Sequence, residues 1–160
     1  MRRPLLTALA LSGLALVPAH AQSAESEVIA ATHGMLAVLK TRDAVAARAL
    51  MTADTRFTLT RPTLEGGTRV VVMTGEQFVE AVTRPGTQVV EEVIRNPVVR
   101  IDGSLATVWA EYQVLVDGVV HHCGYDAFHL VKLGEGWKVL NVSDTYREQG
   151  CGAPWSAGGR

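Results

Sequence analysis

The sequence predicts an α+β domain in which amino-terminal helices cover one face of a curved antiparallel sheet. Apolar residues recur at helical spacing early in the chain, and strand-like patterns occupy most of the chain after residue 87. Asp117-Gly118 stands between valines, which is the strongest short-range hairpin signal in the chain. Helices that precede a block of strands favour an α+β domain over a parallel α/β fold.

The first residues have the pattern of a signal peptide. Arg2 and Arg3 precede the apolar run Leu5–Val17, and Ala19 and Ala21 place small residues where a signal peptidase reads. We therefore predict a signal peptide over residues 1–21 and a periplasmic or secreted protein. The alternatives are export by the twin-arginine route and a buried amino-terminal helix.

The remaining chain is predicted to form one domain, residues 22–151, followed by a flexible tail, residues 152–160. The formal net charge of the whole chain is −1 and no basic stripe occurs, so nucleic acid is a poor candidate partner. After the leader, no apolar run approaches the length of about eighteen residues that a membrane span requires.

Helical patterns predict three helices. Apolar positions repeat over Glu25–Lys40, and Asp43 is a good N-cap for a second helix over Ala44–Met51. A short helix is predicted over Gly75–Thr83, ending before Pro85.

Six strands are predicted from alternation and turn signals. They cover Thr55–Arg61, Thr68–Thr74, Gln88–Ile101, Leu105–Val116, Val119–Leu133 and Trp137–Tyr146. The long third strand is expected to bend or break near Asn96-Pro97.

The run DG…HCGYDAFHLVK…GWKV…SDT and the order of elements resemble the nuclear transport factor two-like superfamily. The chain is most similar to its small exported polyketide-cyclase-like and lumazine-binding-like members, from about Ser26 to Cys151. The resemblance implies a cone-shaped, strongly bent sheet, closed by the amino-terminal helices around an internal pocket. Members include isomerases, dehydratases, cyclases and non-catalytic binding or dimerisation domains, so the resemblance implies the fold more strongly than the chemistry.

The tight Asp117-Gly118 turn predicts the register of the hairpin around it, with Gln113 opposite His122 and Trp109 opposite Asp126. Directly opposed residues share a face. One face is then predicted to carry Trp109, Glu111, Gln113, His122, Asp126, Phe128 and Leu130. The other is predicted to carry Val108, Ala110, Tyr112, Val114, His121, Cys123, Tyr125 and His129.

The first of these faces is our candidate pocket wall. It combines apolar residues with three groups, Glu111, His122 and Asp126, that could exchange protons. Gly124 is expected to leave space between them. The alternative is that these polar residues face water and that the opposite face, which has more valines and alanines, is the interior.

On the last strand, Asn141 and Ser143 are secondary candidates for ligand binding on the side of Trp137, which itself is predicted to be core. Cys123 and Cys151 are expected to form a disulfide in an oxidising compartment, with two free thiols as the alternative. A zinc site at His121, Cys123 and His129 lacks a fourth ligand, so no metal is expected. Phosphate loops and dinucleotide fingerprints are absent, and no cofactor is expected.

The leading hypothesis is an exported domain that binds a small apolar or aromatic molecule, with Trp109, Gln113, Phe128 and Leu130 as wall residues. The enzyme alternative is an isomerase or dehydratase-like proton transfer by His122 with Asp126 or Glu111. A third possibility is a non-catalytic homodimer.

Overall fold

The computed structural model describes residues 23–134 and 136–155, so the predicted signal peptide and residues 156–160 lie outside the described residues. The elements follow the predicted order closely. The helices are α1 (Ala24–Thr41), α2 (Ala44–Leu50) and α3 (Gly75–Val82). The strands are β1 (Met51–Pro62), β2 (Thr68–Thr74), β3 (Val90–Asp102), β4 (Leu105–Val116), β5 (Val119–Leu133) and β6 (Gly136–Asp144).

Local sequence explains where the helices begin and end. The Ser23 side chain accepts a hydrogen bond from Ser26 N at the start of α1, and α1 ends at Arg42, whose φ is 55°. The predicted cap of α2 is confirmed, because Asp43 accepts from the backbone N–H groups of Val45 and Ala46. Thr74 and Gln77 form a capping box at the start of α3.

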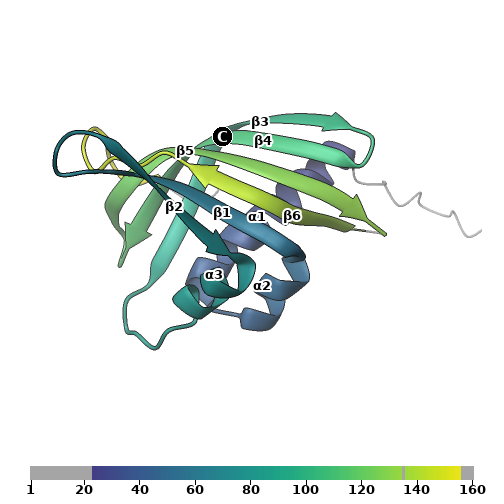
Figure 1. The fold of residues 1–160 in the computed structure, drawn as a ribbon, viewed down its shortest axis with the longest axis horizontal. Helices are drawn as coiled ribbons and strands as arrows, with labels where there is room; N and C mark the ends of the chain where they lie inside the picture. The colour runs from purple at the N-terminus through teal and green to yellow at the C-terminus, as the bar shows by residue number, and fades with distance from the viewer. Residues whose placement is uncertain (1–22, 135, 156–160) are drawn as a thin grey trace, which may run out of the picture.

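The six strands form one curved sheet in the order β2-β1-β6-β5-β4-β3, with the helices on one side (Figure 1). The predicted α+β architecture is confirmed, but the sheet is mixed rather than purely antiparallel, because β1 pairs with β6 in parallel. Strands β3, β4, β5 and β6 pair successively in antiparallel fashion, starting from β3 at the edge farthest from β2. These pairings fix the direction of β6, which lies beside β1. The strand order leaves β2 and β3 as the edges, so the strands do not close into a barrel.

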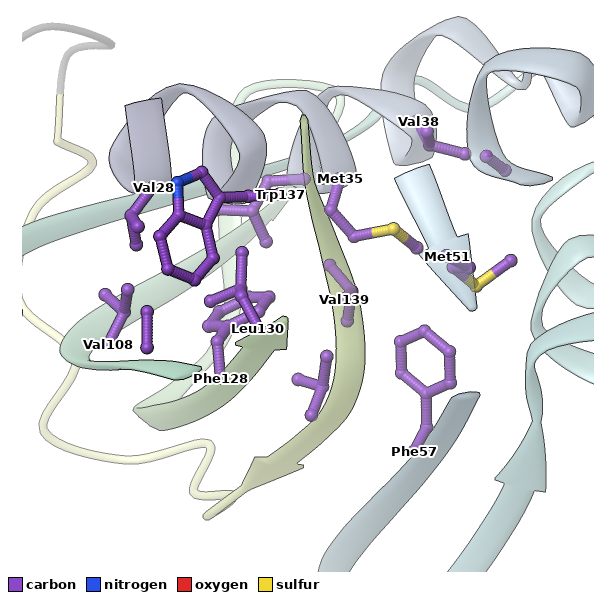
Figure 2. Close-up of a cluster of buried hydrophobic side chains, with 14 of the residues drawn as sticks. Val28, Met35, Val38, Met51, Phe57, Val108, Phe128, Leu130, Trp137 and Val139 are labelled. Atoms are coloured by element: carbon purple, nitrogen blue, oxygen red, sulfur yellow. The ribbon is translucent and has the colours of Figure 1, made fainter. Parts of the chain in front are cut away.

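We call the helix-covered face of the sheet the inner face and the opposite face the outer face. Helix α1 contacts β3 and β6, and α3 contacts β1. Alternate residues on the strands point inward and form the core with α1; they include Ala106, Val108, Ala110, Phe128, Leu130 and Val139. Figure 2 shows Trp137 and Val28 at one end of this cluster and Met51 and Phe57 at the other. Trp137 is 5% exposed, as its predicted core position requires.

A bulge in the β4–β5 hairpin changes the predicted register. The turn itself forms as predicted, with positive φ at Asp117 and Gly118 and with Val116 opposite Val119. The pairing then shifts by one residue, so that His122 lies opposite Val114 rather than Gln113. Because side chains alternate along a strand, this slip exchanges the two faces of β4 relative to β5.

A second bulge interrupts the pairing of β5 with β6. Leu130 pairs with Val139, whereas His129 pairs with Asn141, so Leu140 is the extra residue. Val139 and Val142 therefore both point inward, while Asn141 and Ser143 point outward.

The Cys123–Cys151 disulfide joins β5 to the segment that follows β6, with the two Cα atoms 5.6 Å apart. The predicted bridge is confirmed, and the alternative of two free thiols is wrong. A backbone pairing between Cys123 and Arg147 holds the same segment.

Candidate functional site

A cavity of about 220 Å³ lies between the inner face of the sheet and the helices α1 and α3. Its walls are mainly apolar and come from seven elements: Met35, Leu36, Leu39, Phe57, Leu59, Phe78, Val90, Val114, Phe128 and Val142. The rings of Phe57 and Phe78 stack with their centroids 4.3 Å apart. Six polar residues complete the lining: Arg61, Glu92, Tyr112, His122, Asp126 and Asp144.

Asp126 and Glu92 form a carboxyl pair inside this cavity. Asp126 is 3% exposed, and its Oδ2 accepts no hydrogen bond from any N–H or O–H of the described residues. The Glu92 carboxyl lies within hydrogen-bonding reach of it. Burial, followed by the charge of Glu92, raises the pKa of Asp126 well above its usual value. Burial likewise raises the pKa of Glu92 to about 7. Burial therefore favours the protonated, uncharged form of these two carboxyls.

Arg61 and Asp144 form an ion pair beside the carboxyl pair. The Arg61 guanidinium Nη1 donates to both carboxylate oxygens of Asp144, at 2.7 and 2.8 Å. Asp144 also accepts from the backbone N–H of Thr60. The guanidinium lies over the Tyr146 ring, 5.0 Å from its centroid. The charge of Arg61 is thus already balanced by a partner within the protein.

Tyr112 is 1% exposed, and its hydroxyl donates to the carbonyl of Thr145 at 2.8 Å. Burial and the nearby carboxylates raise the pKa of Tyr112, which keeps the phenol protonated. The expectation that Gly124 leaves space for a ligand is wrong. A Cβ at Gly124 would lie 2.1 Å from the Thr145 carbonyl oxygen, so the backbone of Thr145 occupies that space.

His122 borders the cavity and is held by aromatic and histidine neighbours. Its Nδ1 lies 2.9 Å from Nδ1 of His121, and its ring meets Tyr112 edge-on and Tyr146 at a tilt. Burial, followed by the charges of His121 and Arg61, lowers the pKa of His122 to about 4. His122 is therefore a neutral hydrogen-bonding group at physiological pH.

Of the predicted wall residues, those on β5 lie on the inner face. His122, Asp126 and Phe128 line the cavity, and Leu130 is buried in the core beside it. The prediction that Trp109, Glu111 and Gln113 share this face is wrong, because the bulge at His121 turns them outward.

On the outer face, these β4 residues have structural contacts. Trp109 is 49% exposed and stacks on Tyr125. Glu111 accepts hydrogen bonds from Arg95 and Asn96, which lower the pKa of its carboxyl. The prediction that Glu111 is a neighbour of Asp126 in one pocket is therefore wrong.

Gln113 is fully buried and binds the segment after β6. Its amide donates to the carbonyls of Cys151 and Ala153, at 2.6 and 3.1 Å, and its oxygen accepts from Trp155 N at 2.9 Å. Cys151, together with Ala153 and Trp155 of the predicted flexible tail, is thus bound to β4. Arg95 lies over the Trp155 ring, 4.0 Å from its centroid, and adds a second contact.

Asn141 and Ser143 do not line the cavity. They were predicted to lie on the Trp137 side of β6, but the bulge at Leu140 turns them to the outer face, where they bond to each other. Val142 and Asp144 take their place on the inner face.

Sequence reasoning missed Arg61, Glu92, Tyr112 and Asp144 as cavity residues. A signal for Tyr112 was available, because β4 alone alternates cleanly between the apolar residues Ala106, Val108, Ala110, Tyr112 and Val114 and a more polar set. That pattern supports the alternative in which the valine-rich side of β4 is the interior. Glu92 lies two strands away from Asp126 in the sheet, so no pattern within one strand relates the two residues.

Known proteins resemble this chain in structure but not in sequence. No protein-family model matches the chain, and no curated protein matches it. An NTF2-like protein from Cytophaga hutchinsonii superposes with a TM-score of 0.64 at 16% identity, over 79% of this chain and 100% of that one. A Nostoc punctiforme protein of unknown function with a cystatin-like fold gives 0.60 at 10% identity, over 78% and 92%.

An NTF2-like protein with a cystatin-like fold from Novosphingobium aromaticivorans gives a TM-score of 0.59 at 11% identity, over 79% of this chain and 84% of that one. Together these structures confirm the nuclear transport factor two-like fold that the sequence resemblance implied. At such low identity they establish the fold alone.

Proposed function

We propose that the protein binds a small, largely apolar molecule that carries one polar group. The observation that supports this most directly is the cavity, whose apolar walls enclose a single polar end at Glu92 and Asp126. Apolar walls remove the body of a ligand from water, and a few polar groups fix its orientation.

The size of the cavity suggests the size of the ligand. A cavity of about 150 Å³ is enough to bind benzene in an engineered protein. A cavity of about 220 Å³ therefore suits one substituted ring or a compact bicyclic molecule. The stacked Phe57 and Phe78 rings would lie against a planar ligand.

We also propose that the protein works outside the cytoplasm, after removal of residues 1–21. The Cys123–Cys151 bridge supports this location, because structural disulfides persist mainly in oxidising compartments. Within the described part of the chain, no helix is long and apolar enough to cross a membrane.

A cavity-filling variant tests the binding proposal. Val114 lines the cavity, and Val114→Phe should occupy its volume and weaken binding of propylbenzene, measured by calorimetry, by more than about tenfold. Val119→Phe adds the same ring at a position that is 68% exposed and should leave binding unchanged. Equal binding by the Val114→Phe variant, with its fold confirmed by circular dichroism, would refute the proposal.

One observation favours a second function, proton transfer of the isomerase or dehydratase type. The Glu92–Asp126 pair holds a proton near neutral pH, and neutral His122 lines the same cavity. Glu92 thereby replaces Glu111 as the partner considered for Asp126. The test is deuterium incorporation from D₂O at the carbons next to the carbonyl of cyclohexanone. Loss of that exchange in Asp126→Asn would support the enzyme, and absence of exchange in the unmodified protein would oppose it.

A further inference from the structure

One carboxyl oxygen at the polar end of the cavity, Oδ2 of Asp126, has no hydrogen-bond donor among the described residues. Asp126 is 3% exposed, yet its Oδ2 accepts no N–H or O–H hydrogen bond within residues 23–134 and 136–155. A proton held between Asp126 and Glu92 would bridge one oxygen of each carboxyl and leave the other oxygens without a donor. Because a buried acceptor without a donor costs free energy, the remaining carboxyl oxygens favour a ligand group that donates.

The charges around this end distinguish between ligand classes. Three carboxyls line the cavity, from Glu92, Asp126 and Asp144, and Arg61 is the one guanidinium or ammonium group among its described lining residues. Arg61 is already bound by Asp144. An anionic ligand would therefore meet uncompensated negative charge, whereas a cation would compensate it.

The cation that fits is organic rather than a metal ion. Among the described residues, no group of three or more His, Cys, Asp and Glu side chains is arranged to hold a metal. The walls beside the carboxyl pair are apolar and include Phe57, Phe78 and Phe128. A ligand cation that also carries a hydrocarbon group can pack that group against these apolar walls.

We propose that the cavity binds a small apolar amine in its protonated form, whose N–H groups donate to Asp126 and Glu92. This inference rests on the proposed binding function and adds the ligand class. An ammonium group carries three N–H donors and a positive charge. It can therefore donate to the carboxyl oxygens and also compensate their negative charge.

Binding by this route releases the shared proton. The free pair holds a proton between Glu92 and Asp126, and the bound ammonium replaces it, so the proton leaves to solvent. Arg61, Asp144, Tyr112 and His122 are the other charged or titratable groups facing the pair. Arg61 and Asp144 bind each other, Tyr112 stays protonated and His122 stays neutral above about pH 5. Affinity for an amine should then rise about tenfold between about pH 6 and about pH 8.

Five probes with the same number of non-hydrogen atoms test the ligand class by calorimetry. Phenethylamine is the cation, benzoate the anion, 2-phenylethanol a neutral donor, acetophenone a neutral acceptor and propylbenzene an apolar control. Phenethylamine should bind at least about tenfold more tightly than each of the others near pH 8. It should also release protons, seen as a dependence of heat on the ionisation enthalpy of the buffer.

Variants that remove one carboxylate test whether the preference for phenethylamine arises at the Glu92–Asp126 pair. Asp126→Asn and Glu92→Gln should each reduce phenethylamine affinity by at least about tenfold, while propylbenzene affinity changes less than about threefold and reports an intact cavity. Glu91→Gln is the matched control, because Glu91 bonds to Lys40 and does not line this cavity. Propylbenzene, acetophenone or 2-phenylethanol binding as tightly as phenethylamine would overturn the amine inference and leave the binding function standing. Failure of all five probes to bind would overturn both.

Discussion

The inner and outer faces of the β4–β5 hairpin both carry buried or half-buried polar side chains, but the two faces satisfy them differently. On the outer face, Gln113 and Glu111 are bonded to neighbouring groups of the protein. On the inner face, Oδ2 of Asp126 has no donor among the residues that the structure describes. Polar groups on the outer face thus hold the structure together.

The inner-face carboxyls of Glu92 and Asp126 instead reduce the stability of the fold. Their pKa values are raised by burial, which means that folding leaves them less well solvated than in the unfolded chain. Residues that destabilise a fold in this way are common where a ligand binds. The contrast predicts that substitutions on the two faces will differ in the size of their effects.

The largest effect is expected at Gly124, where the inner face meets the end of β6. In Gly124→Ala, the new Cβ would collide with the Thr145 carbonyl, which is backbone and is held by Tyr112. We expect the free energy of unfolding to fall by about 3 kcal/mol in denaturant titrations. Gly136→Ala is the control, since a Cβ there meets nothing within 4 Å, and it should change stability little. Equal stabilities of the two variants would contradict the close approach at Gly124.

A smaller loss is expected at Gln113 on the outer face. Gln113→Leu keeps a similar volume but leaves two carbonyls and the Trp155 N–H without their partner. The free energy of unfolding should fall by about 2 kcal/mol, and amide exchange at Trp155 should accelerate even with the disulfide intact. Gln149→Leu, at an exposed position on the same segment, should do neither. Unchanged exchange at Trp155 would show that the disulfide alone holds the segment.

Most of the fold could be predicted from the sequence because its signals are local. Caps such as Asp43, the Asp117-Gly118 turn and the alternation of single strands each depend on a few neighbouring residues. The inward set on β5 was also correct, since His122, Asp126, Phe128 and Leu130 keep one phase along the strand.

The candidate site could be predicted only in part, because its assembly depends on bulges and on distant pairings. Neither His121 nor Leu140 has a sequence feature that marks it as the extra residue, yet each bulge changes which side chains of the sheet point inward. The encounter of Glu92 with Asp126 requires β3, β4 and β5 to lie side by side. No local pattern contains that information.

The smallest effect we predict is a difference in the pH dependence of stability. Because the pKa values of Glu92 and Asp126 are raised, the folded protein holds protons that the unfolded chain has lost, and stability falls as pH rises through about 7. His122 has a lowered pKa and acts in the opposite direction, but only between about pH 4 and about pH 6.5. From about pH 6.5 to about pH 8, the carboxyl pair should therefore lower the free energy of unfolding by roughly 1 kcal/mol.

Asp126→Asn should flatten this slope, because it removes the carboxyl whose pKa burial and Glu92 raise well above its usual value. Glu111→Gln provides the matched test on the outer face. The pKa of Glu111 is lowered by hydrogen bonds from Arg95 and Asn96, so its carboxylate is ionised in both the folded and the unfolded chain above about pH 6. That variant should keep the slope of the unmodified protein in denaturant titrations across this range. A flattened slope in Glu111→Gln, or an unchanged one in Asp126→Asn, would remove the distinction between the two faces.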